Sequence, residues 1–188
     1  MFMHKTTCKK LAGSLIAAAL VAACASTPES TTSTTPTRGP NLGATPSPAM
    51  LAAMDISIPP SGAGLPAGSG NVAQGQKVFE AKCQSCHGPK GAGKPADPLV
   101  GGIGSLASGK PMRTVGSYWP YATTLFDYTR RAMPTTAPMS LTNEEVYAVT
   151  AYVLHLNGVV PEAAVMNAQT LPQVKMPNRD GFIDYSRK

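Results

Sequence analysis

The stretch Cys83-Gln84-Ser85-Cys86-His87 places two cysteines three residues apart, with a histidine directly after the second. This is the attachment pattern of a c-type haem. Thiols on one short helical turn can form thioethers with the two vinyl groups of a single haem, and His87 then lies where its imidazole can bind the iron as the proximal ligand. The motif therefore predicts one covalently bound haem c.

Two other uses of paired cysteines fit the sequence less well. A structural zinc site needs a second pair of cysteine or histidine ligands. The remaining cysteines and histidines form no such pair, since they stand alone in the chain: Cys8, Cys24, His4 and His155. A thioredoxin-type redox pair belongs in a strand–helix–strand context, which the flanking residues do not supply. Haem attachment is therefore the favoured interpretation of the motif.

Residues 1–23 have the features of a secretory signal peptide. A basic n-region contains Lys5, Lys9 and Lys10. The apolar run that follows is shorter than a transmembrane helix requires. Without these lysines, thirteen basic side chains remain against ten acidic ones, a net charge of +3 in place of +6. That excess is too small and too dispersed to indicate a nucleic-acid-binding protein.

The predicted signal peptide ends in Leu20-Val21-Ala22-Ala23-Cys24, which resembles the lipobox of bacterial lipoproteins. Cleavage there leaves a cysteine that carries a diacylglycerol thioether, and two or more acyl chains anchor a protein stably. We expect Cys24 to be lipidated. Ala25, in place of the aspartate expected for inner-membrane retention, favours the outer membrane. The alternative is cleavage at Ala23-Cys24-Ala25, which would release a soluble periplasmic protein.

Composition divides the rest of the chain into three parts. Residues 24–70 are rich in Ser, Thr, Pro, Gly and Ala, and we expect a lipid-anchored linker, because such a segment buries too little apolar surface to offset the cost of ordering. Residues 71–160 carry the helical signals and are predicted to form a monohaem domain. Residues 161–188 show little periodicity and are predicted to form an irregular extension packed on that domain.

Capping and breaking residues predict three helices in the haem domain, which run from Asn71 into the haem motif, from Pro120 to Met133 and from Thr142 to Gly158. The first and third begin with capping boxes, completed by Gln74 and Glu145. Segment 88–117 is rich in glycine and proline and is predicted to be a loop. A loop of this length in a small domain usually has a function such as binding, and here we expect it to surround the haem.

An iron held by His87 alone would be open to small ligands, so an electron carrier needs a sixth ligand. We predict Met133, because it lies at a helix end before Pro134 and because a thioether raises the reduction potential. Met139, in the same loop, is the runner-up. Each methionine can also be interpreted as a core residue.

Residues around the second helix are candidates to hold the haem propionates, namely Trp119, Tyr118, Tyr121 and Arg113. Buried anionic groups need such partners, although the three rings are equally typical of an aromatic core. A group of lysines surrounds the haem motif, namely Lys77, Lys82, Lys90 and Lys94. These lysines could steer an acidic redox partner or simply form a solvated surface.

Four features resemble class I cytochromes c over residues 71–160: a helix with Gly75 and Phe79, the haem motif, the Met133-Pro134 loop and a final helix with Tyr152. The resemblance implies an all-α fold wrapped around one covalent haem. It also implies that the first and last helices cross near Gly75, Phe79 and Tyr152.

A second resemblance covers residues 114–183. The stretches TVGSYWPYATTLFDY at 114–128, RRAMP at 130–134, LTNEEVYAVTAY at 141–152 and MPNRDGF at 176–182 are similar to the cytochrome subunit of Sox sulfane dehydrogenases. In that family the methionine that matches Met133 is the iron ligand. Its members accept electrons from a molybdenum-cofactor protein of the sulfite-oxidase type. Members of the full type carry two haem domains, whereas this chain has one haem motif.

The sequence thus predicts a periplasm-facing, membrane-tethered cytochrome c that carries single electrons and is not itself an enzyme. The resemblance implies a molybdenum-containing sulfite or sulfane dehydrogenase as the electron donor. Two alternatives remain open. One is a general carrier that delivers electrons to a terminal oxidase or reductase. The other is a haem enzyme of the peroxidase or thiosulfate-oxidising type, whose haem loses its methionine.

Overall fold

The computed structural model describes residues 43–183 and 185–187. The chain divides into two units, 1–45 and 46–188, and the haem motif lies in the second. The expected signal peptide, the expected lipidation site Cys24 and the first part of the expected linker fall outside the described residues. Within the part of the chain that is described, no helix has both the length and the apolar character to cross a membrane.

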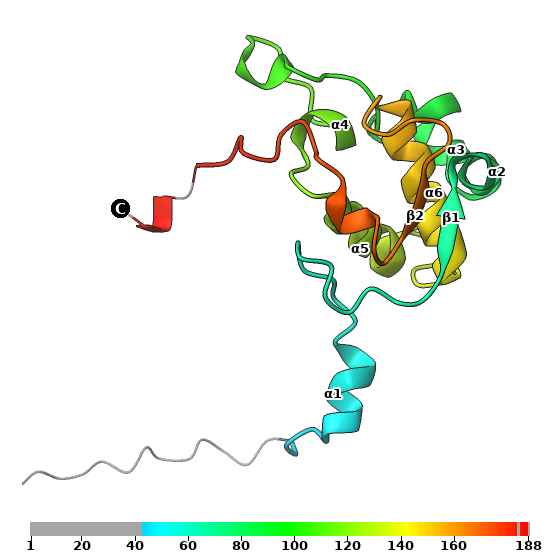
Figure 1. The fold of residues 1–188 in the computed structure, drawn as a ribbon, viewed down its shortest axis with the longest axis vertical. Helices are drawn as coiled ribbons and strands as arrows, with labels where there is room; N and C mark the ends of the chain where they lie inside the picture. The colour runs from blue at the N-terminus through cyan, green and yellow to red at the C-terminus, as the bar shows by residue number, and fades with distance from the viewer. Residues whose placement is uncertain (1–42, 184, 188) are drawn as a thin grey trace, which may run out of the picture. The chain divides into compact units, whose positions relative to one another are not determined.

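The second unit is built from helices and one short sheet (Figure 1). The α-helices are α1 (Pro48–Met54), α2 (Val72–Lys82), α3 (Gln84–His87), α4 (Val115–Tyr118), α5 (Ala122–Ala132) and α6 (Asn143–Leu156). The short 3-10 turns among the described residues are η1 (Pro89–Gly91), η2 (Ser105–Ala107), η3 (Leu171–Gln173) and η4 (Tyr185–Arg187). Strands β1 (Ser69–Asn71) and β2 (Val165–Asn167) pair antiparallel. The predicted all-α architecture is confirmed, with this small sheet added.

Helices α2 and α6 pack directly against each other (Figure 1). A side chain at Gly75 of α2 would overlap the carbonyl oxygen of Ala148 in α6, so glycine allows the two backbones to approach. Phe79 is fully buried, and its ring centroid lies 5.4 Å from that of Tyr152. The contact between the helices holds the C-terminal end of α2 against α6, and the haem motif begins at that end.

The folded domain begins earlier than residue 71, where the sequence placed it. Ile58 is only 6% exposed and belongs to the hydrophobic core, and its backbone N–H donates to Asp127 Oδ1 at 2.8 Å. Two side-chain hydroxyls donate to proline carbonyls of the same segment, Thr123 to Pro60 and Tyr147 to Pro66. The sequence of segment 56–66 does not reveal these contacts, because most of them are made by backbone carbonyls. Such contacts leave no pattern in the side chains, so the segment has the composition of a linker.

The C-terminal segment is more ordered than its sequence indicates. Residues 165–167 form β2 on β1, and three side chains of the segment are buried in the core: Met166, Leu171 and Met176. Three-residue strands and isolated buried side chains give no periodic signal, which explains why the sequence predicted an irregular extension.

Candidate haem site

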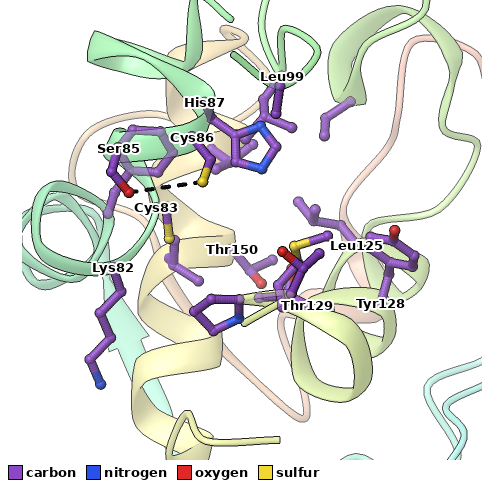
Figure 2. Close-up of a pocket in the computed structure, with 18 of the residues that line it drawn as sticks. Lys82, Cys83, Ser85, Cys86, His87, Leu99, Leu125, Tyr128, Thr129 and Thr150 are labelled. Carbon is purple, nitrogen blue, oxygen red and sulfur yellow. Dashed lines mark hydrogen bonds between the residues drawn. The ribbon is translucent and has the colours of Figure 1, made fainter. Parts of the chain in front are cut away.

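A cavity of about 530 Å³ opens between the haem motif and helices α5 and α6 (Figure 2). This volume lies within the roughly 300–1,000 Å³ of typical cofactor sites. The walls are mainly apolar, with contributions from Leu99, Val115, Trp119, Leu125, Val149 and Val153. Such a cavity can enclose a large planar apolar group and exclude water from it.

The haem motif lies on a single helical turn at one side of this cavity. Cys83 ends α2 and also caps α3, so the motif follows α2 without a loop. The backbone N–H groups of Cys86 and His87 both donate to the carbonyl of Cys83, at 3.2 and 3.0 Å. Neither cysteine is in a disulfide, and all three residues line the cavity. One turn therefore presents two thiols and an imidazole to the same space, as attachment of a haem requires.

The ring of His87 is oriented by the loop that follows the motif. Its Nδ1 lies 3.1 Å from the carbonyl oxygen of Asp97. A carbonyl oxygen can only accept a hydrogen bond, so Nδ1 carries the proton and donates. In the neutral imidazole, Nε2 is then the nitrogen with a free lone pair, which can bind a metal. The hydrogen bond thus fixes both the tautomer and the direction of the ring.

The surroundings of Cys83 suit a neutral sulfur. Burial raises the pKa of this thiol to about 11, although the positive charge of Lys82 partly opposes the effect. A site that disfavours the thiolate is poorly suited to a zinc ligand, which must be deprotonated. In residues 43–183 and 185–187, no group of three or more His, Cys, Asp or Glu side chains could hold a metal ion. A thioether is neutral, so the residues present fit a covalently attached haem.

Met133 lines the same cavity as His87, whereas Met139 does not. Met133 ends α5 with extended backbone, and its N–H still donates to the carbonyl of Thr129 at 3.1 Å. Met139 is 65% exposed and has a positive φ of 60°. The structure therefore brings one of the two methionine candidates to the haem motif. Ligation of the iron by Met133 stays a prediction.

Of the four propionate candidates, Trp119 lines the cavity, and Tyr118, Tyr121 and Arg113 do not. The guanidinium of Arg113 lies 5.6 Å from the ring centroid of Tyr118, and the Tyr118 ring contacts Phe182 edge-on at 5.2 Å. Trp119 instead meets Tyr128, another residue of the cavity wall, with 5.7 Å between ring centroids. Tyr118 and Arg113 thus belong to a surface cluster with the C-terminal segment.

Only one of the four lysines around the motif lines the cavity. Lys82 Nζ forms an ion pair with Glu145 Oε1 at 2.6 Å, and this hydrogen bond holds the pKa of Glu145 below its usual range. The other three are exposed and are not among the residues that line the cavity: Lys77, Lys90 and Lys94. Their role in docking stays a prediction.

Sequence reasoning missed two residues that shape the site. Asn157, after α6, accepts from the N–H of Gly101 at 3.2 Å and donates to the carbonyl of Leu99 at 3.1 Å. Asn157 thereby fixes the loop around Leu99 and Gly101 to the end of α6. In the sequence, its position before a glycine indicates only a helix end. Thr150 lines the cavity from within α6. It lies among the apolar residues of that helix, where no local signal marks it.

Comparison with known proteins agrees with this geometry. The cytochrome c family model matches residues 72–157. The fold is similar to the crystal structure of the sulfane dehydrogenase SoxCD from Paracoccus pantotrophus, with a TM-score of 0.72 and 40% identity over 78% of this chain and 73% of that chain. A search of curated proteins found no match. Identity at this level over most of both chains, together with the family match across the cavity, shows that the chain belongs to the cytochrome c family.

Proposed function

We propose that the chain carries single electrons as the cytochrome subunit of a sulfur-compound dehydrogenase, with one haem c. Cys83 and Cys86 would hold the haem, and His87 and Met133 would ligate its iron. One observation carries the proposal: the two thiols, the imidazole and the thioether all face a single apolar cavity. A haem with both axial positions taken by protein side chains passes electrons at its edge and binds no substrate.

The residues of the site have separate tasks in this proposal. The bound haem supplies the change in iron oxidation state. His87, held by the carbonyl of Asp97, would offer Nε2 to the iron in a fixed direction. The apolar wall around Leu99, Val149 and Val153 would exclude water from the haem. A dry site disfavours the more highly charged ferric state and so raises the reduction potential.

The electron donor that we propose is a molybdenum-containing sulfite or sulfane dehydrogenase. The 40% identity to a chain of SoxCD, a sulfane dehydrogenase, supports this choice. The lipobox-like sequence before Cys24 supports attachment to the periplasmic face of a bacterial membrane, with the outer membrane favoured. Without lipidation, the protein would be soluble in the periplasm.

The test is a pull-down of the tagged, haem-loaded full chain from its own membranes. The bound fraction is assayed for molybdenum and for reduction of the haem by sulfite or by a sulfur-loaded carrier protein. Co-purification of a molybdenum protein that reduces the haem is the expected result. Absence of such a partner, with rapid oxidation of the haem by a terminal oxidase, would contradict the proposal and indicate a general carrier. A matched sample that carries Met133→Ala shows whether haem reduction depends on the sixth ligand.

A further inference from the structure

The hydroxyl of Thr150 is buried and has no hydrogen-bond partner, a combination that is rare in proteins. The Thr150 side chain is 1% exposed, and it lines the haem cavity. Its hydroxyl is the single buried side-chain nitrogen or oxygen, among the residues that the structure describes, that has no hydrogen-bond partner. A buried hydroxyl without a partner costs free energy, and buried polar groups in proteins are therefore almost always bonded. Because Thr150 lines the cavity, a group bound there can supply the partner.

Other buried threonines show what this chain does elsewhere. The hydroxyl of Thr123 donates to the carbonyl of Pro60 at 3.2 Å, and that of Thr114 donates to the carbonyl of Gly101 at 2.6 Å. The neighbours of Thr150 on the cavity side of α6 are Val149 and Val153. Valine has nearly the shape of threonine, so packing alone does not explain a hydroxyl at position 150.

Thr150 lies on the side of the cavity where a sixth ligand must come from. In Figure 2, His87 stands at one side of the cavity, and Thr150 and Thr129 lie on the other. Thr129 is in the last turn of α5, whose end is Met133, and α5 packs against α6. If His87 binds a haem iron from its side of the cavity, a sixth ligand would come from the opposite side. Thr150 and Met133 therefore share that half of the site.

We propose that the Thr150 hydroxyl donates a hydrogen bond to the sulfur of Met133 when that sulfur is bound to the haem iron. A thioether sulfur that binds a metal keeps a second lone pair, which can accept a hydrogen bond. The bond withdraws electron density from the sulfur, so the sulfur becomes a weaker donor to ferric iron and the reduction potential rises. Thr150 is thus a positioning and tuning residue. This inference rests on the proposed ligation by Met133.

The test compares three variants of the haem-loaded full chain in a spectroelectrochemical titration. Thr150→Val removes the hydroxyl at nearly constant volume and is expected to shift the potential downward. Thr150→Ser keeps a hydroxyl and is expected to stay near the wild-type potential. Thr123→Val is the matched control, because Thr123 is equally buried but lies outside the cavity wall. It should lower thermal stability without moving the potential.

Thermal unfolding of the same variants supplies an independent readout. If the hydroxyl remains unpartnered in the loaded protein, Thr150→Val should raise the melting temperature and leave the potential unchanged, and this result would overturn the inference. If Thr150→Val does not load haem, Thr150→Ala takes its place, and an unchanged potential is again the contrary result.

Met133→Ala separates the two proposals. If the optical spectrum and the potential of Met133→Ala equal those of the wild type, Met133 is not the ligand and the proposed function loses its basis. If Met133→Ala changes both but Thr150→Val changes neither, the ligation stands and only the role of Thr150 is wrong.

Discussion

Two walls of the haem cavity are held in place by different kinds of contact. The His87 wall, residues 83–97, is held by bonds within itself: Ala96 N–H to the Cys86 carbonyl at 2.8 Å, Gly93 N–H to the His87 carbonyl at 2.7 Å, and His87 Nδ1 to Asp97. The Met133 wall, residues 125–136, is held by contacts with distant parts of the chain. A local motif can thus specify the first wall, whereas the second depends on the whole fold.

The distant contacts of the Met133 wall run to the N-terminal segment. Asp127 accepts from the N–H of Ile58, and Arg130 donates to the carbonyl of Ile56 at 3.3 Å. Arg131 forms an ion pair with Asp127 on the solvent side. Segment 56–66 therefore acts as a strap that holds α5, and through α5 it holds Met133. Damage to the strap should affect the methionine side of the site before the histidine side.

The largest effect is expected from replacing both thiols of the His87 wall. Cys83→Ala with Cys86→Ala removes the two sulfurs that form thioethers, so no haem should remain attached after denaturation. Haem staining of a denaturing gel measures this directly, with the wild type as the positive control. A stained band from the double variant would show that other atoms hold the haem.

Met133→Ala should leave the haem attached but open its sixth position. Because axial ligands set haem potentials over a range of about 0.8 V, we expect the potential to fall on the order of 0.1 V. Exogenous ligands such as cyanide should then bind. Met139→Ala is the matched control, since Met139 is exposed and lies outside the cavity, and its potential should equal that of the wild type. The reverse pattern would assign the ligand to Met139.

Gly75→Ala should destabilise the whole domain, because α2 leads into the His87 wall and α6 packs against both α2 and α5. The added methyl group would overlap the Ala148 carbonyl, and overpacking of this kind costs about 1–3 kcal/mol. Gly109→Ala is the control, since nothing lies within 4 Å of its added side chain. Denaturant unfolding of the haem-loaded variants measures the difference. Equal stability of the two variants would mean that the helices do not meet as described.

The smallest effect is expected from Asp127→Asn, which weakens the bond between the strap and α5 and the ion pair with Arg131. Burial raises the pKa of Asp127, but hydrogen bonds from Arg131 and from the Ile58 N–H outweigh it, so its pKa lies below the ordinary value. The folded state therefore favours the carboxylate. The resulting stability is present above the unfolded-state pKa of about 4 and is lost as the pH falls through the lower folded-state value.

We therefore expect Asp127→Asn to cost about 0.5–1.5 kcal/mol of unfolding free energy at pH 7 and less near pH 3. Melting temperatures at the two pH values measure this. Glu162→Gln, at an exposed carboxylate, is the control and should change neither. A cost that does not depend on pH would show that the carboxylate charge of Asp127 is not what holds the strap.

The same division explains how far the sequence could lead. The His87 wall could be predicted because a five-residue motif and a capping box specify it locally, and Gly75 and Phe79 indicated the helix crossing. The strap could not be predicted, because its bonds come from backbone carbonyls of a proline-rich segment. Nor could Thr150, because nearly every residue around it in α6 is buried and the sequence does not show which of them line the cavity.

The central claim is that His87 and Met133 hold the iron from opposite sides, and ligand binding to the wild-type protein tests it most directly. Carbon monoxide is added to the reduced, haem-loaded protein at neutral pH, and the optical spectrum is followed. The account predicts no rapid binding and, in the oxidised protein, the weak charge-transfer band of a sulfur–iron bond. Immediate formation of a carbon monoxide complex, with that band absent, would contradict the account and indicate a haem with an open catalytic position.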